Sequence, residues 1–152
     1  MDKILEVKNL RVSFNTYVGE IRAVRGVSFE LRRGETLAFV GESGCGKTVT
    51  AKSILRLLPP VSAEIKAGSE ILYKGENVLQ MGQKRLQRYR GNEVSMIFQD
   101  PMTSLNPTMT CGQQIVEALM LLKKLSKQEA KAEAIKTLEL VKIPDPEKRF
   151  SA

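Results

Sequence analysis

Hydrophobic and polar residues alternate along the first forty residues, with the period of two that is typical of β-strands with one buried face. The apolar positions of this pattern are Leu5, Val7, Leu10, Val12, Phe14, Val24, Val27, Phe29 and Leu31. Glycines at positions 19, 26 and 34 interrupt it. We therefore predict that the chain begins with β-strands separated by glycine-containing turns.

Further β-rich segments follow in the middle of the chain. Residues 63–68 and 69–75 carry the strand pattern again, and residues 94–98 form a short apolar run that leads into Gln99. Residues 83–90 are mostly polar and are predicted to form a short helix. The sequence predicts β structure over the first two segments and a buried strand over the third.

Toward the C-terminal end the pattern becomes helical. Thr110-x-x-Gln113 and Ser126-x-x-Glu129 have the form of capping boxes, which begin helices. Apolar residues recur at helical spacing after each box, and the second series stops before Pro144. Two successive helices are predicted here.

One segment joins a strand pattern directly to a helix pattern. Residues 36–40 are a short apolar run, and apolar residues recur at helical spacing from Thr48 to Leu58. The sequence between them matches G-x-x-x-x-G-K-[ST] at every fixed position. Its residues are Gly41, Glu42, Ser43, Gly44, Cys45, Gly46, Lys47 and Thr48. Strand, glycine-rich loop and helix are the context this motif requires, so we predict a phosphate-binding loop.

The residue types of this loop suit a nucleoside triphosphate. Glycines let the backbone wrap an anion closely, and the helix directs the positive end of its dipole at it. Lys47 supplies a cation for the β- and γ-phosphates, and the Thr48 hydroxyl is a ligand for Mg²⁺. A glycine-rich turn without a ligand is the alternative, and the complete match disfavours it.

Composition narrows the class of protein. The 152 residues are enough for one domain or slightly more, and 42% hydrophobic with 27% charged residues is ordinary for a globular protein. No apolar run reaches the ~18 residues of a membrane span, and the N-terminal sequence lacks the form of a signal peptide. The absence of histidine excludes His-based catalysis and metal binding. We expect a cytoplasmic location.

The net charge of +7 has two interpretations. One is an anionic partner such as nucleic acid or a lipid surface, and the other is a scattered basic surface. The densest basic run is residues 84–90, and no nucleic-acid-binding motif accompanies it. We favour the scattered surface and expect no nucleic-acid partner.

Residues 94–107 (VSMIFQDPMTSLNP) resemble the glutamine loop of ATP-binding cassette (ABC) ATPases, in the form seen in oligopeptide, dipeptide and nickel permease subunits. Residues 7–14, 23–29 and 34–44 also fit this family, so the resemblance spans about the whole chain. It implies an α/β fold: a P-loop NTPase core, the ABC nucleotide-binding domain, with an N-terminal antiparallel β-subdomain and the start of a helical subdomain.

The resemblance also implies roles for individual residues. Gln99 would reach the Mg²⁺ and the attacking water, which makes it a predicted catalytic residue together with Lys47. Phe14 falls where the family stacks an aromatic ring on adenine, although Tyr17 in the following insertion is an alternative, as is packing of both within the β-subdomain. ATP and Mg²⁺ are the implied cofactors, with Thr48 and Gln99 as metal ligands.

The implied partners are integral-membrane permease subunits, which residues 102–120 would face, and a second ATPase subunit. An extracytoplasmic substrate-binding protein would act indirectly. The implied location is the cytoplasmic face of the cell membrane. The implied function is that of the ATP-binding subunit of a peptide-type importer, which couples ATP hydrolysis to uptake.

Several elements of the family do not occur in these residues. There is no Ser-Gly-Gly signature loop, no apolar strand ending in Asp-Glu, and no switch histidine. We therefore expect residues 1–101 to form the β-subdomain and the P-loop part of the core, residues 102–152 a partial helical subdomain, and the C-terminal half of the domain to be absent. The core sheet would be incomplete. The chain would bind ATP and hydrolyse it very poorly.

Other interpretations stay open. A catalytically inert nucleotide-binding remnant is one alternative. A small kinase or GTPase is another, but neither an Asn-Lys-x-Asp motif nor a nucleoside-binding lid is evident. An ABC ATPase that acts on nucleic acid is a third, and the resemblance of residues 102–107 to importers disfavours it. The transported substrate cannot be read from this chain.

Overall fold

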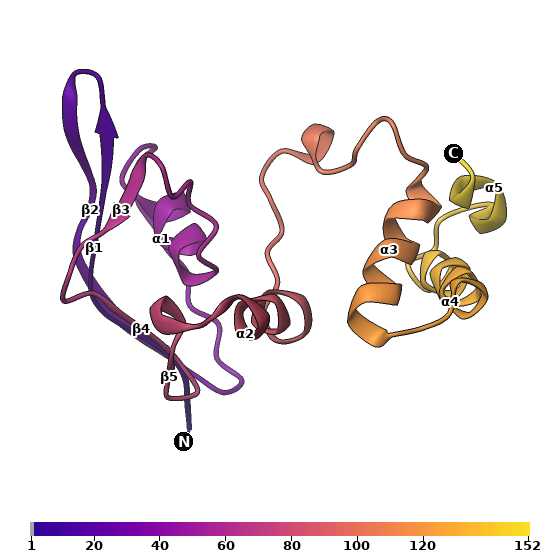
Figure 1. Ribbon diagram of the computed structural model, residues 1–152, viewed down its shortest axis with the longest axis horizontal. Coiled ribbons are helices and arrows are strands. Elements are labelled where there is room, and N and C mark those ends of the chain that lie inside the picture. The colour runs from indigo at the N-terminus through magenta and orange to yellow at the C-terminus, as the bar shows by residue number, and fades with distance from the viewer. Residues whose placement is uncertain (1) are drawn as a thin grey trace. The chain divides into compact units, whose positions relative to one another are not determined.

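A long β-hairpin begins the structure, a computed structural model that describes residues 2–152. Strands β1 (Lys3–Thr16) and β2 (Gly19–Arg32) pair antiparallel from their open ends to the turn (Figure 1). Gly19 at the tip has a φ of 131°, which L-residues with a side chain rarely adopt. The β-strands predicted for this part of the chain are confirmed.

Three short strands extend the hairpin into an antiparallel sheet. Their bounds are β3 (Ala63–Ile65), β4 (Glu70–Tyr73) and β5 (Glu76–Asn77). The sheet has the order β2-β1-β4-β5, and β3 also pairs with β1. The β structure predicted between residues 63 and 75 is confirmed.

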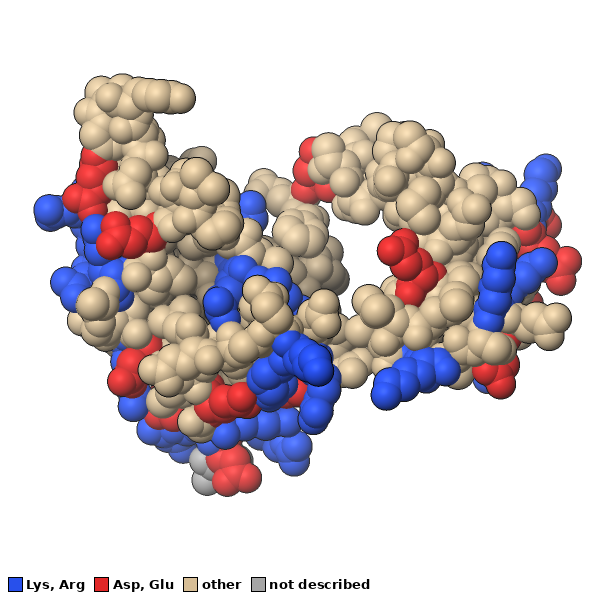
Figure 2. Space-filling model, viewed as in Figure 1, with Lys and Arg blue, Asp and Glu red and all other residues tan. Residues whose placement is uncertain are grey.

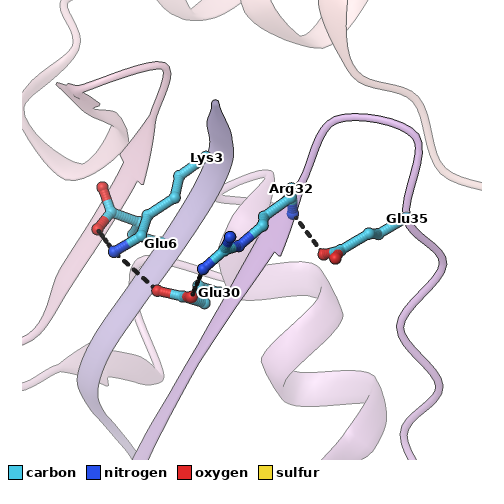
Figure 3. Close-up of polar contacts among 5 residues, drawn as sticks. All are labelled: Lys3, Glu6, Glu30, Arg32 and Glu35. Carbon is cyan, nitrogen blue, oxygen red and sulfur yellow. Dashed lines mark hydrogen bonds and ion pairs between the residues drawn. The ribbon is translucent and has the colours of Figure 1, made fainter. Parts of the chain in front are cut away.

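Ion pairs join the open ends of β1 and β2 (Figure 3). Lys3 Nζ lies 2.8 Å from a Glu30 carboxylate oxygen and 3.5 Å from Glu6, and Arg32 Nη2 lies 3.3 Å from Glu30. The Glu35 carboxylate accepts a 2.9 Å hydrogen bond from the Arg32 backbone N–H. These groups are exposed or half-exposed, so the contacts contribute little to stability. They lie at the turn from which the chain runs toward the glycine loop.

Two helices accompany the sheet. Helix α1 (Lys47–Ile54) follows the glycine loop as predicted, but it ends before Leu58 because Arg56 adopts a left-handed conformation with φ 52°. Helix α2 (Gln83–Arg88) confirms the predicted polar helix, follows the 3₁₀ turn η1 (Val78–Gln80), and continues into a π-helical turn, η2 (Tyr89–Glu93). Of the described residues, those up to Arg90 form one compact unit and those from Gly91 onward form another.

The buried side chains of the first unit come from the sheet and from both helices. Leu10 and Val12 of β1 and Ile71 of β4 are fully buried, and so is Tyr89 after α2. The Tyr73 and Tyr89 rings meet edge to face with centroids 5.2 Å apart. This packing holds α2 and the start of η2 on the sheet.

Two predicted strands do not form. Residues 36–40 and 94–98 have no strand partner within residues 2–152, and Val40 and Ile97 are 94% and 97% exposed. A strand requires a neighbour that pairs with its backbone N–H and C=O groups, and neither segment has one here. The prediction of buried strands at these positions is therefore wrong for this structure.

The second unit is helical. Its elements are the 3₁₀ turn η3 (Pro101–Thr103) and the helices α3 (Cys111–Lys123), α4 (Lys127–Leu140) and α5 (Pro146–Phe150). Both predicted capping boxes form, one between Thr110 and Gln113 and the other between Ser126 and Glu129. Helix α5 has no counterpart among the helices predicted from the sequence.

The core of the second unit is small. Val116 of α3 and Ala130 and Ala134 of α4 are its buried residues, and the Phe150 ring packs against them. A Cβ added at Gly112 would lie 2.4 Å from Phe150 Cγ, so only glycine allows α3 and α5 to approach this closely. Among the helices of residues 2–152, none has the length and hydrophobicity to cross a membrane.

Candidate nucleotide-binding site

The glycine loop, residues 41–48, lies in the first unit and leads directly into α1. Gly44 and Gly46 have φ angles of 82° and 94°, in the left-handed region that favours glycine. Gly46 is the N-cap of α1, and no side chain caps the helix there. The first backbone N–H groups of α1 are therefore not taken by a capping side chain, which is the arrangement that binds anions at helix N-termini.

Gly46 also lies directly against β2. A Cβ at this position would be 2.7 Å from the Ala23 carbonyl oxygen and 3.4 Å from Val24 Cγ2. At the start of the loop, a Cβ on Gly41 would be 2.6 Å from the Cys45 sulfur. The start of the loop thus contacts Cys45, and its end contacts β2 of the hairpin. Both close approaches require glycine, at positions 41 and 46.

The Lys47 ammonium group folds back over the loop. Lys47 Nζ donates hydrogen bonds to the carbonyl oxygens of Gly41 and, at 3.3 Å, of Glu42. The Cys45 backbone N–H donates to the same Glu42 oxygen at 3.3 Å. The cation is therefore held above the curve of the loop, where it can exchange these neutral acceptors for phosphate oxygens, which bind an ammonium group more strongly.

Thr48 is exposed in the first turn of α1. The next hydroxyls along the helix are used internally: Thr50 Oγ1 donates to the Gly46 carbonyl at 2.8 Å, and Ser53 Oγ donates to the Val49 carbonyl at 2.7 Å. Thr48 is thus the hydroxyl of this helix that is presented to solvent beside Lys47, as a metal ligand needs to be.

The two candidate aromatic residues occupy different environments on the hairpin. Phe14 is half-buried and lies two residues after Val12, so both side chains are on one face of β1. Val12 pairs with Val24, which lies beside Gly46. Tyr17 is fully exposed at the hairpin tip, where Figure 2 shows only uncharged residues. Phe14 is thus two residues from Val12, whose partner Val24 approaches Gly46, and the pairing of β1 with β2 shifts register between Val12 and Ser13.

Gln99 belongs to the second unit. It is exposed and precedes Asp100, whose side chain caps η3 by accepting a 2.9 Å hydrogen bond from the Met102 backbone N–H. The structure thus brings Phe14 and the loop residues into one unit and places Gln99 in the other. Tyr89 and Arg90 contact the C-terminal end of α1 and were not among the predicted site residues. Their signal in the sequence is the basic run at residues 84–90.

Comparison with solved structures identifies the fold. A dimeric structure of MJ0796, a bacterial ABC transporter cassette, matches with a TM-score of 0.76 at 20% identity, over 97% of this chain and 60% of that one. A post-hydrolysis structure of the same cassette, bound to ADP and Pi, matches equally well. The fold is thus that of an ABC ATPase cassette.

Sequence comparison gives the family. The family described as ABC transporter matches residues 24–151. The chain belongs to the ABC transporter family, which confirms the resemblance found in its motifs.

Its relatives include ATP-binding proteins of peptide transport systems. The dipeptide transport ATP-binding protein DppD of Bacillus subtilis (strain 168) is 55% identical over 99% of this chain and 44% of its own length. The oligopeptide transport ATP-binding protein OppD of the same organism is 54% identical over 98% and 41%, and OppD of Escherichia coli (strain K12) is 46% identical over 98% and 43%. The chain spans less than half the length of these relatives.

Proposed function

We propose that residues 41–48 bind the phosphates of ATP, with Mg²⁺ as its counterion. The observation that carries this proposal is the Lys47 ammonium group, held over a loop whose helix has no side-chain cap. The family hydrolyses ATP, and the loop supplies the cation, the backbone donors and the hydroxyl that a triphosphate with its metal requires.

The metal would depend on few protein ligands. Within residues 2–152 no three His, Cys, Asp or Glu side chains are grouped to hold an ion. Mg²⁺ commonly takes one or two protein oxygens and fills its octahedron with phosphate oxygens and water, so the Thr48 hydroxyl and the Gln99 amide oxygen suit it. Gln99 would also orient the attacking water, and Lys47 would neutralise charge on the transferred phosphoryl group.

Phe14 is the residue that we propose to stack on adenine. It lies two residues from Val12, whose partner Val24 approaches Gly46 of the glycine loop, whereas Tyr17 is fully exposed at the hairpin tip. Replacing Phe14 with Ala should weaken MgATP binding, since stacking contributes about 1–3 kcal/mol per base. An unchanged affinity for Phe14→Ala together with a loss for Tyr17→Ala would transfer the role to Tyr17.

For the whole protein, we propose the role of ATP-binding subunit in a peptide-type ABC importer at the cytoplasmic face of the membrane. The names of its relatives support dipeptides or oligopeptides as cargo. Membrane permease subunits, contacted through residues 102–120, and a second ATPase subunit are the proposed partners. Residues 1–152 by themselves should bind ATP and hydrolyse it slowly, because they include no apolar strand ending in Asp-Glu to supply a general base.

Uptake of labelled peptides tests the transport role. In cells deleted for the gene, the full-length protein should restore dipeptide or oligopeptide uptake, and Lys47→Ala should not. Lys84→Ala, an exposed lysine of α2, is the matched control and should restore uptake fully. Restoration by Lys47→Ala would contradict the proposal, and restored nickel uptake without peptide uptake would change the cargo.

A further inference from the structure

Two neighbouring side chains hold the C-terminal end of α1. The Tyr89 hydroxyl donates to the Ile54 carbonyl oxygen at 2.8 Å, and Arg90 Nε donates to the Leu55 carbonyl at 2.7 Å. Arg90 Nη2 donates to the carbonyl of Arg56. Three consecutive carbonyls at the end of the helix, which have few partners within a helix, are thus bound by one residue pair. We call Tyr89 and Arg90 the α1 clamp.

The α1 clamp is itself firmly placed. Tyr89 is fully buried and its ring packs edge-on against Tyr73 of β4. Arg56, at the end of α1, donates to the carbonyls of Val78 and Met81 at 3.2 and 2.8 Å. The end of α1 is therefore joined to the sheet and to η1 by side chains, whereas its N-terminal end has no side-chain cap.

The length of α1 makes its far end relevant to the nucleotide. The helix has eight residues and is about 12 Å long, so it turns as one rigid rod. Lys47 and Thr48 occupy its first turn. A change in direction at the C-terminal end therefore moves the ammonium group and the hydroxyl that face the phosphates.

We propose that Arg90 is a positioning residue for the nucleotide site: its guanidinium fork fixes the direction of α1 and so aims Lys47 and Thr48 at the phosphates. This inference rests on the proposed binding of MgATP by residues 41–48. A guanidinium holds two carbonyls in one fixed plane, which an ammonium group cannot do, so arginine and lysine are not equivalent here. A cation beside the last carbonyls of a helix also suits its dipole.

The test compares Arg90→Lys with Arg88→Lys in the full-length protein. Arg88 is an exposed arginine two residues earlier, so the control makes the same chemical change without touching α1. Tyr89→Phe removes the remaining hydrogen bond of the α1 clamp with little change in shape. The readouts are the Kd for MgATP, the thermal midpoint, and the amide NMR shifts of Gly46, Lys47 and Thr48 without nucleotide.

Arg90→Lys should raise the Kd for MgATP about tenfold and shift those amide signals, and Tyr89→Phe should act in the same direction but less. Arg88→Lys should leave both unchanged. If Arg90→Lys and Arg88→Lys bind MgATP alike, the proposal is overturned, even where the thermal midpoint falls, because a structural role alone lowers only stability. If the wild type does not bind MgATP, the proposed function fails, and the amide shifts still decide whether Arg90 sets the direction of α1.

Discussion

Gly46 meets two separate requirements of the glycine loop. Its φ of 94° lies in the left-handed region, and its α-carbon faces the Ala23 carbonyl with no room for a Cβ. Gly75, between β4 and β5, has a similar φ of 83° but open space around it. Replacing Gly75 with alanine therefore introduces backbone strain alone, whereas replacing Gly46 introduces the same strain and a clash with β2.

We predict that Gly46→Ala abolishes MgATP binding and destabilises the first unit more than Gly75→Ala does. Gly75→Ala should cost about 1 kcal/mol, the strain of a left-handed alanine, and should leave MgATP affinity intact. Urea unfolding and MgATP titration of both variants measure the difference. Equal affinities for the two variants would show that the contact of Gly46 with β2 does not shape the site.

The residues of the site differ in how far the sequence predicts them. Gly41 to Thr48 are contiguous, so the motif alone specifies both the loop and the start of its helix. Arg90 reaches Leu55 across 35 positions, and no local pattern reports such a contact. The motif also does not predict that the Lys47 side chain bonds to the Gly41 carbonyl, because this contact depends on the backbone path of the loop.

Among the secondary-structure elements, the predictions succeeded where the backbone hydrogen bonds join residues that are close in the sequence. The helices that follow Thr110 and Ser126 were predicted from capping boxes, since the bonds of a helix lie within four residues of each other. Residues 36–40 and 94–98 have strand-like composition, but a strand needs a distant partner that composition does not provide. The stop predicted before Pro144 is consistent with the end of α4, but the sequence pattern does not show that Pro146 begins a new helix, α5, in whose first turn a proline is well tolerated.

The two capping boxes differ in charge, which gives a pH prediction. The Ser126 backbone N–H donates to the Glu129 carboxylate at 2.9 Å, and this bond lowers the pKa of Glu129 from its ordinary value. A lowered pKa in the folded state means that the stabilisation is complete above the unfolded-state pKa and is lost as pH falls through the folded-state pKa. The other box uses neutral Gln113 and has no such dependence.

We therefore predict that Glu129→Ala destabilises the second unit at neutral pH and has less effect in acid, whereas Gln113→Ala in the neutral box has the same effect at both. Glu129→Gln keeps a capping side chain and should remove the difference. Circular dichroism during urea unfolding at two pH values measures this. A Glu129→Ala effect that is constant with pH would mean that the charge of the Glu129 carboxylate does not contribute.

In the whole molecule, exposed apolar residues flank Gln99 in the segment of residues 94–103, which precedes helix α3. Ile97 and Met102 are 97% and 87% exposed, and Phe98 is 51% exposed. Gln99, the predicted link to the γ-phosphate, lies within this segment. A protease can cut beside exposed apolar residues such as these. If bound nucleotide holds the segment in place, the rate of cleavage should fall.

Chymotrypsin should cleave the free protein after Phe98, and MgATP should slow this cut if Gln99 binds the metal as we propose. Gln99→Ala should be cleaved equally fast with and without MgATP, while Gln80→Ala, an exposed glutamine of η1, should behave like the wild type. Mass spectrometry of timed digests measures the rates. Protection that persists in Gln99→Ala would show that this side chain does not carry the contact.

Calorimetric titration shows whether the Lys47 loop binds the phosphates of MgATP. Wild-type protein should bind one MgATP per chain, and Lys47→Ala should lose that binding while its thermal midpoint stays close to that of the wild type. Lys84→Ala should titrate like the wild type. Equal binding by Lys47→Ala and wild type, or no binding by the folded wild type, would contradict the account.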